Sequence, residues 1–102
     1  MEERYRIVLP SRVANQLEKI SAYIHRDSPQ NAPEMIGRIL GAIEGLKAFP
    51  YRNVAGAGGR VPVRSLPVQS FIIFFRVQDE EGVVEILEVR HGARKRPKRF
   101  RK

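Results

Sequence analysis

The sequence FIIFFRVQDEEGVVEILEV, residues 71–89, decides the fold of this chain. It contains two nearly continuous apolar runs, 71–77 and 83–89, separated by the polar turn Asp79-Glu80-Glu81-Gly82. Runs of this length that are rich in β-branched and aromatic residues are typical of strands covered on both faces. A short polar turn between two such runs is typical of a β-hairpin. The stretch therefore predicts two neighbouring antiparallel strands at the centre of a sheet.

A third strand is expected just before this hairpin, from Val61 to Leu66. Pro62 and Pro67 flank it, and because proline cannot donate a hydrogen bond to a central ladder, an edge position is expected. The segment YRNVAGAGGR at 51–60 is rich in glycine and is interpreted as a mobile connection. It is not a phosphate-binding loop, since no Gly-Lys-Ser/Thr follows it.

Two amphipathic helices are expected in the first half of the chain. In the first helix, apolar residues recur at helical spacing from Val13 to Ile24, Ser11 offers a capping hydroxyl, and the pattern ends near Arg26. The second helix carries one broad apolar stripe that ends at Phe49-Pro50 and consists of Met35, Ile36, Ile39, Leu40, Ile43 and Leu46. The segment between them breaks the pattern, and either Ser28 or Asn31 is a candidate cap for the second helix.

A short strand from Tyr5 to Leu9, ended by Pro10, precedes the helices. The expected element order is thus β-α-α-β-β-β. This order predicts an α+β fold in which a helical hairpin packs on one face of a small, mostly antiparallel sheet. We expect a single domain over residues 1–94, because a chain of 102 residues forms one core, and a basic C-terminal tail at 95–102.

Three glycines of the second helix, Gly37, Gly41 and Gly45, are spaced by four and therefore line one narrow strip of its surface. Each costs roughly 1 kcal/mol relative to alanine in a helix interior, so three in register suggest that another element approaches closely there. Close packing of the first helix against this strip is the favoured interpretation. A docking groove for a partner helix is the alternative.

The formal net charge of +8 is concentrated at one end of the chain. Residues 1–89 hold eleven Lys/Arg and eleven Asp/Glu, whereas residues 90–102, RHGARKRPKRFRK, hold eight Lys/Arg and no acid. Clustered cations attract nucleic acid, anionic membrane or an acidic protein surface. We therefore expect the C-terminal end to bind a macromolecular target, with a solvated tail that only aids solubility as the alternative.

Composition argues against several other classes of protein. With no cysteine and two histidines, neither a disulfide framework nor a transition-metal site is expected. No stretch approaches the roughly 18 apolar residues of a membrane span, and the N-terminus MEERYRIVLP lacks the apolar run of a secretion leader. The sequence predicts a cytoplasmic protein that uses neither a cofactor nor a membrane.

The chain resembles the RelE/ParE toxins of bacterial type II toxin-antitoxin systems. The resemblance lies in the strand YRIVL, the helix VANQLEKISAYI, the segment SPQNAPEMIGRILGAIEGLKAFP, the hairpin VPVRSLPVQSFIIFFRV and the terminal strand EILEVRHGARKR. Each piece is degenerate alone, but their order and spacing together are specific. The resemblance implies the same β-α-α-β-β-β arrangement, a toxic activity and neutralisation by a cognate antitoxin in a toxin-antitoxin hetero-oligomer.

The family divides by activity. RelE-like members are ribosome-dependent mRNA endonucleases, whereas ParE-like members inhibit DNA gyrase without nuclease activity. The segment His91-Gly92-Ala93-Arg94 resembles the ParE-like branch. RelE-like nucleases place an arginine directly after an aromatic residue on the central strand, where this chain has Phe71 followed by Ile72. The resemblance therefore favours a gyrase inhibitor over a nuclease that acts on mRNA at the ribosome, and a plain nucleic-acid-binding module is a third hypothesis.

Candidate site residues follow from these hypotheses. The charge pattern predicts a target-binding set at the basic end: Arg90, His91, Arg94, Lys95, Arg96, Lys98 and Arg99. If the protein is a nuclease, proton transfer and charge stabilisation would come from His91, Arg94 and Arg64. For His91 the alternative is a purely structural role at a strand end. The expected antitoxin-binding residues are Gly37, Gly41, Gly45, Val61 and Val63.

Overall fold

The computed structural model describes residues 5–51 and 61–92. Along the chain the elements are β1 (Arg6–Val8), α1 (Ser11–Asp27), α2 (Asn31–Gly45), β2 (Arg64–Val68), β3 (Phe71–Gln78), a 3₁₀ turn (Asp79–Glu81) and β4 (Val83–His91). Residues 52–60 of the predicted loop and the whole of the predicted tail at 95–102 lie outside the described residues. So do the first four and the last two residues of the predicted 1–94 domain.

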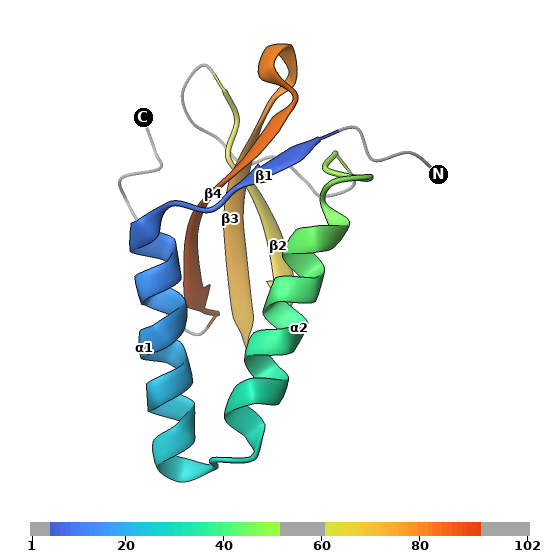
Figure 1. Cartoon of the computed structure of the whole chain (residues 1–102). Coiled ribbons are helices and arrows are strands. Elements are labelled where there is room, and N and C mark those ends of the chain that lie inside the picture. The colour runs from blue at the N-terminus through green and yellow to red at the C-terminus, as the bar shows by residue number, and fades with distance from the viewer. Residues whose placement is uncertain (1–4, 52–60, 93–102) are drawn as a thin grey trace.

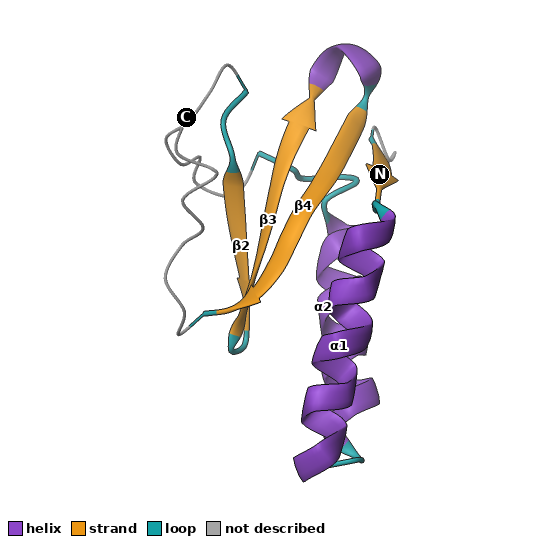
Figure 2. Ribbon diagram, turned by 90° about the vertical axis from the view of Figure 1, so that its left-hand side faces the viewer, coloured by secondary structure: helices purple, strands orange, loops and turns teal. Residues whose placement is uncertain are grey.

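The four strands form one sheet in the order β1-β4-β3-β2 (Figure 1). β1 pairs with β4 in parallel, and the other two pairings are antiparallel. The two helices run side by side and lie on one face of this sheet (Figure 2). The predicted α+β class, the central β3–β4 hairpin and the edge position of the proline-flanked strand are confirmed.

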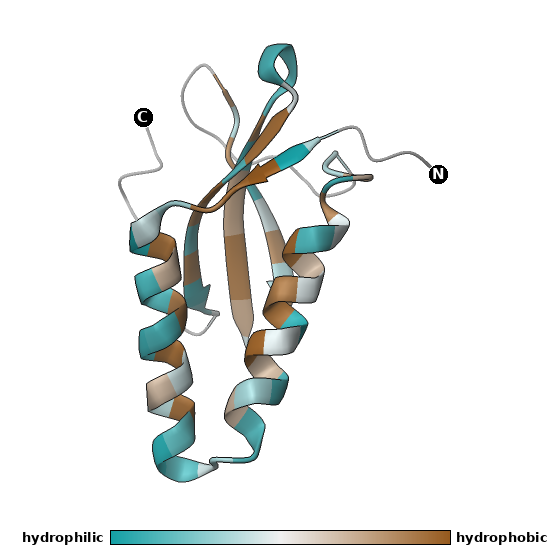
Figure 3. Ribbon diagram, in the orientation of Figure 1, coloured by the Kyte–Doolittle hydropathy of each residue, from teal (hydrophilic) through white to brown (hydrophobic). Residues whose placement is uncertain are grey.

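The main core lies between the helices and the sheet. Alternate residues of β3, namely Phe71, Ile73, Phe75 and Val77, point towards the helices because successive side chains of a strand face opposite sides. They meet buried apolar residues of α1 and α2, including Val13 and Ile39. Figure 3 shows the apolar stripe of each helix turned inward. Full burial of each such side chain contributes about 1.5–3 kcal/mol, so this layer is the main source of stability.

A second, smaller apolar cluster lies on the opposite face of the sheet. Phe74, which alternates with the core-facing residues of β3, packs there with Val63 and Leu87. The pairing of β3 with β4 shifts by one residue between Phe74 and Phe75. Such a bulge adds an unpaired residue to one strand and increases the local twist. Both faces of the central strands therefore bury apolar side chains, as their continuous apolar sequence predicts.

The structure corrects two details at the helix starts. Ser11 is the first residue of α1 rather than its cap, because Pro10 holds the extended capping position and its carbonyl accepts hydrogen bonds from the first turn. Helix α2 begins at Asn31, four residues before the predicted apolar stripe, and neither Ser28 nor Asn31 caps it by its side chain. Pro33 fits in the first turn, where backbone N–H groups have no partner within the helix.

The third correction concerns the edge strand. The sequence predicted a strand from Val61 to Leu66, but β2 runs from Arg64 to Val68 and includes Pro67. Pro67 stands opposite Ile72 in β2, at the edge of the sheet. Proline is tolerated in an edge strand because an N–H on the outer side of that strand has no neighbouring strand to bond. Proline therefore marked the correct position in the sheet but not the end of the strand.

Candidate functional site

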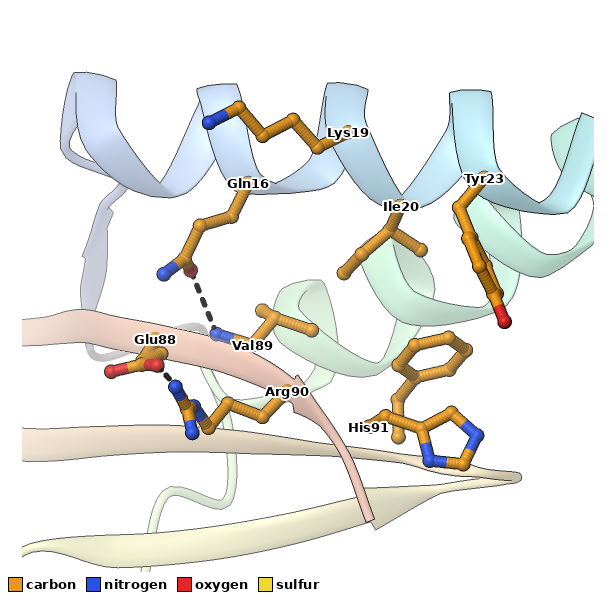
Figure 4. A pocket seen from close by; sticks show the side chains of 9 residues that line it. Gln16, Lys19, Ile20, Tyr23, Glu88, Val89, Arg90 and His91 are labelled. Carbon is orange, nitrogen blue, oxygen red and sulfur yellow. Dashed lines mark hydrogen bonds and ion pairs between the residues drawn. The ribbon is translucent and has the colours of Figure 1, made fainter. Parts of the chain in front are cut away.

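The end of the sheet remote from the β3–β4 turn contains two adjoining cavities. Helix α1 runs alongside the last residues of β4, and a cavity of about 440 Å³ opens between them (Figure 4). A second cavity of about 410 Å³ continues towards α2 and the β2–β3 turn. The two share Tyr23, Phe71 and His91 in their walls. We call this region the open end of the sheet.

His91, the central residue of the predicted site, is exposed at the open end. Its ring stands edge-on to Phe71, its partner in the strand register, with centroids 5.3 Å apart. The next residue, Gly92, donates its backbone N–H to the Ser70 carbonyl at 2.6 Å. A Cβ on Gly92 would lie 3.1 Å from the same oxygen, so the close approach favours glycine. The strand end is thus fixed against the β2–β3 turn, and His91 points into the solvent-accessible region beside it.

Arg90 is held by a buried carboxylate. Glu88 is 2 % exposed and forms an ion pair and hydrogen bond with the Arg90 guanidinium, two residues along the same face of β4. A buried carboxylate needs such a partner, because burial of an unpaired charge is costly. Sequence reasoning considered Glu88 only as a possible proton-transfer group and did not predict its pairing with Arg90, although the spacing of two within an apolar strand was the available signal.

Arg64 lies at the other end of the sheet. Its guanidinium carbon is 4.6 Å from the ring centroid of Tyr51, a cation–π arrangement. Tyr5 donates a hydrogen bond to Asp79 at 2.6 Å, and Tyr51 donates one to the second oxygen of the same carboxylate. The two tyrosine rings meet edge-on at 6.4 Å. We call these four residues the turn-end cluster.

The turn-end cluster shifts the acidity of Tyr51. The hydrogen bond to Asp79, assisted by burial and by the negative charge of that carboxylate, raises the pKa of Tyr51 from 10 to about 12. Each of these factors disfavours the phenolate. The cluster joins four segments that are distant in sequence, and no local pattern indicated it.

The structure does not bring together the residues of the predicted nuclease site. Arg64 stands opposite Phe75 and His91 opposite Phe71, so they are separated by four residues along β3, or about 13 Å. Arg94 lies outside the described residues. A general acid or base must lie within hydrogen-bonding reach of its proton, and charge-stabilising cations must be close to the same reacting group. This geometry gives no support to a joint role of Arg64 and His91.

The other predicted target-binding cations also lie beyond the described residues, at 94–99. The described chain ends one residue after His91, so the basic segment begins at the open end. Over residues 5–51 and 61–92, no group of three His, Cys, Asp or Glu side chains could hold a metal ion. No helix in those ranges is long and apolar enough to span a membrane.

The glycine strip of α2 is exposed, so the favoured interpretation that α1 packs against it is wrong. A Cβ built on Gly37, Gly41 or Gly45 would have no atom within 4 Å. The reason is that Ile39 and Ile43 point into the core from the opposite side of the helix. Leu40, beside the strip, is 43 % exposed. The face is therefore open to a partner.

The other two predicted antitoxin-binding residues occupy a different layer. Val63 is 5 % exposed and packs with Phe74 on the face of the sheet away from the helices. Val61 is half-buried. The glycine strip and these valines therefore do not form one flat surface, and a partner that contacts both would have to wrap around the β2 edge.

Comparison with known proteins agrees with this architecture. Residues 7–96 match the family described as the ParE toxin of the type II toxin-antitoxin system, parDE. Y4kP of Sinorhizobium fredii, described as a candidate toxin, is 33 % identical over 97 residues that cover 92 % of this chain and 95 % of that protein.

Solved structures share the fold at lower sequence identity. The chromosomal ParDE system from P. aeruginosa contains a chain that superposes with a TM-score of 0.71 at 21 % identity, covering 88 % of this chain and 98 % of that one. A chain of the archaeal RelE-RelB complex from Pyrococcus horikoshii gives a TM-score of 0.65 at 15 % identity, covering 90 % and 99 %.

The fold is that of the RelE/ParE class of toxins. By the extent of the family match, this chain belongs to the ParE toxin family of type II toxin-antitoxin systems.

Proposed function

We propose that this toxin inhibits DNA gyrase in the cytoplasm through its basic C-terminal end, without chemistry of its own, and that a cognate antitoxin neutralises it. The observation that carries the proposal is the division of the candidate residues between the two ends of the sheet. His91 packs on Phe71 at the open end, whereas Arg64 stacks on Tyr51 at the turn end. Because His91 and Arg64 are separated, they are poorly placed to act together in a nuclease site. The separation therefore favours a toxin that binds its target over one that cleaves RNA with these two residues.

The charge distribution supports a binding mechanism. All of the formal net charge of +8 is carried by residues 90–102, which begin beside the open end. A concentrated positive field accelerates the encounter with a negatively charged partner and strengthens its binding. The match to the ParE family over residues 7–96, which includes part of this segment, supports gyrase as the target.

The exposed strip of α2 is the surface that we propose for an antitoxin helix. Gly37, Gly41 and Gly45 leave the helix backbone accessible, and Leu40 beside them offers an apolar anchor. Amphipathic helices commonly bind a partner through an apolar face. A solved structure with a similar fold is the toxin-antitoxin complex RelBE2 from Mycobacterium tuberculosis, which supports a partner of this kind.

Purified protein tests the proposed target directly. We expect inhibition of gyrase in a DNA supercoiling assay, and relief of that inhibition by the product of the adjacent reading frame. The same preparation is added to a translating extract, where we expect no cleavage of mRNA. Unchanged supercoiling together with cleaved mRNA would exclude gyrase and establish the ribosome-dependent nuclease instead.

A further inference from the structure

Within residues 5–51 and 61–92, Glu88 is the one charged side chain that the fold buries. Its carboxylate accepts a hydrogen bond from the Nε of Arg90, and the two side chains form an ion pair. Apolar side chains of similar size often stabilise a protein as well as such a pair does, because the desolvation of the charges offsets their attraction. The pair of Glu88 and Arg90 therefore calls for a reason other than stability.

The guanidinium of Arg90 is only partly used by this pair. Its Nε donates to Glu88, and over the described part of the chain no other hydrogen bond or ion pair involves it. The Arg90 side chain is 31 % exposed. Its two Nη groups therefore keep their N–H donors available to solvent. Two such groups form a planar fork that binds both oxygens of a carboxylate or phosphate at once.

The strand that carries this fork is fixed on two sides. Arg90 is paired with Ile72 of β3 in the strand register. On the other side, the Val89 N–H donates to the Gln16 side chain of α1 at 3.0 Å, as Figure 4 shows together with the bond from Arg90 to Glu88. An arginine whose backbone and Nε are both held loses less conformational freedom when it binds an anion, so more of the contact energy contributes to affinity.

The space beside the pair indicates which anion fits. Glu88 and Arg90 both line the 440 Å³ cavity, in which Ile20, Tyr23 and Phe71 supply apolar surface. An acidic residue that is next to an apolar residue in a protein chain can contact the fork and this apolar wall together. A DNA phosphate is flanked by sugars and further phosphates, which would leave the apolar wall without a matching contact. The surroundings therefore favour a carboxylate over a phosphate.

We infer that Glu88 is a positioning residue, which holds Arg90 so that its two Nη groups bind a carboxylate of the protein that this toxin inhibits. The inference rests on the proposed binding mechanism and adds the chemistry of one contact, an acidic side chain with an apolar neighbour. Residues 90–102 as a whole supply long-range attraction, since they hold eight Lys/Arg and no acid. The pair of Glu88 and Arg90 supplies a contact with a defined geometry.

Arg90→Lys tests the fork, with purified DNA gyrase as the probe. The substitution keeps a positive charge beside Glu88, so the fold should survive, but it removes the two Nη groups. Binding to gyrase in the absence of DNA, measured by titration calorimetry, should weaken about tenfold or more, and growth arrest on induction should weaken with it. Arg76→Lys is the matched control, because Arg76 pairs with Glu85 in the same sheet and is 35 % exposed, but lies near the β3–β4 turn. It should leave both measurements unchanged.

A double-mutant cycle tests whether Glu88 acts through Arg90. Glu88→Leu frees the guanidinium, which can turn to solvent, so we expect a folded protein that binds about 3–10-fold more weakly. In the Arg90→Met background the same substitution should cause no further loss, because no guanidinium remains to be held. The double variant should resist urea as well as wild type does or better, which separates loss of binding from loss of fold. An equal loss in both backgrounds would overturn the positioning role.

The result with gyrase separates this contact from the proposed target. If wild type binds gyrase and Arg90→Lys binds equally tightly, gyrase stands as the target and the contact through Arg90 is excluded. If wild type does not bind gyrase, but Arg90→Lys relieves growth arrest and Arg76→Lys does not, gyrase is excluded and the contact stands for another protein. Full arrest by Arg90→Lys without gyrase binding would exclude both.

A short DNA duplex as a second probe distinguishes the two anions. We expect Arg90→Lys to bind the duplex as wild type does, because a lysine at this position keeps the positive charge that attracts phosphates. If the substitution weakens binding to the duplex but not to gyrase alone, the anion is a phosphate and the assignment to a carboxylate is overturned.

Discussion

The two ends of the β3–β4 hairpin are built differently. At the turn end, one carboxylate, Asp79, accepts hydrogen bonds from Tyr5 and Tyr51, and Arg64 stacks on Tyr51. These contacts join the N-terminal strand, the segment after α2, the edge strand and the turn. At the open end, two adjoining cavities separate the helices from the strand ends. Polar contacts thus join four segments at the turn end, whereas solvent-accessible space adjoins the strand ends at the open end.

Removal of residues 95–102 should have the largest effect on activity. The deletion removes six of the eight Lys/Arg that follow Val89, and it removes no residue of the described core. Loss of electrostatic steering should lower association with the target roughly 10–1000-fold, so growth arrest on induction should disappear. Circular dichroism should show an unchanged fold.

A charge-neutral tail of the same length separates charge from length. We expect the full-length chain with Gln at the six cationic positions of 95–102 to be as inactive as the truncation. Full toxicity of that variant would show that the tail acts through shape or specific contacts, and that its charge is dispensable.

Among the substitutions at the two ends of the hairpin, Asp79→Ala should have the largest effect on stability. It removes two hydrogen bonds to a charged acceptor, but the site is exposed, so we expect a loss of about 1–3 kcal/mol in the free energy of unfolding. Urea denaturation measures the change. Glu80→Ala, which removes the same charge from the neighbouring turn residue, is the control and should change stability by less than about 0.5 kcal/mol. Equal effects of both substitutions would show that the cluster contributes nothing beyond charge.

Alkaline pH should weaken the turn end selectively. The folded protein raises the pKa of Tyr51 from 10 to about 12, so the fold favours the neutral phenol. The resulting stabilisation is complete below pH 10 and is lost as the pH rises towards 12. Denaturation curves over this range should show the decline in wild type and a smaller decline in Tyr51→Phe. Tyr23→Phe, at the open end, should retain the wild-type decline.

His91→Ala at the open end should have the smallest effect. The exposed ring loses an edge-on contact with Phe71, which is worth at most about 1 kcal/mol. Most of the growth arrest should remain, since the substitution scarcely changes the positive field of the basic end. If His91 transferred a proton in RNA cleavage, activity would instead fall roughly 100-fold or more. Abolished arrest in a folded His91→Ala protein would therefore favour the nuclease over the gyrase inhibitor.

The sequence by itself determined the fold and the location of the charge. The apolar runs 71–77 and 83–89 and the helical spacing of Val13 to Ile24 are local patterns, and hydrophobic burial acts on them regardless of distant contacts. These patterns predicted the element order, the central hairpin and the edge strand, all of which the structure confirms. The position of the basic residues at one end of the chain follows from counting alone.

Only the tertiary structure decided how distant residues meet. The bond from Arg12 to Leu87 and that from Tyr5 to Asp79 each join residues more than seventy positions apart. The exposure of Gly37, Gly41 and Gly45 was likewise undetermined, because spacing places them on one face of α2 but does not show what faces them. Periodicity fixes the direction of a side chain relative to its own element, whereas a site depends on how the elements pack, which is set by the whole core.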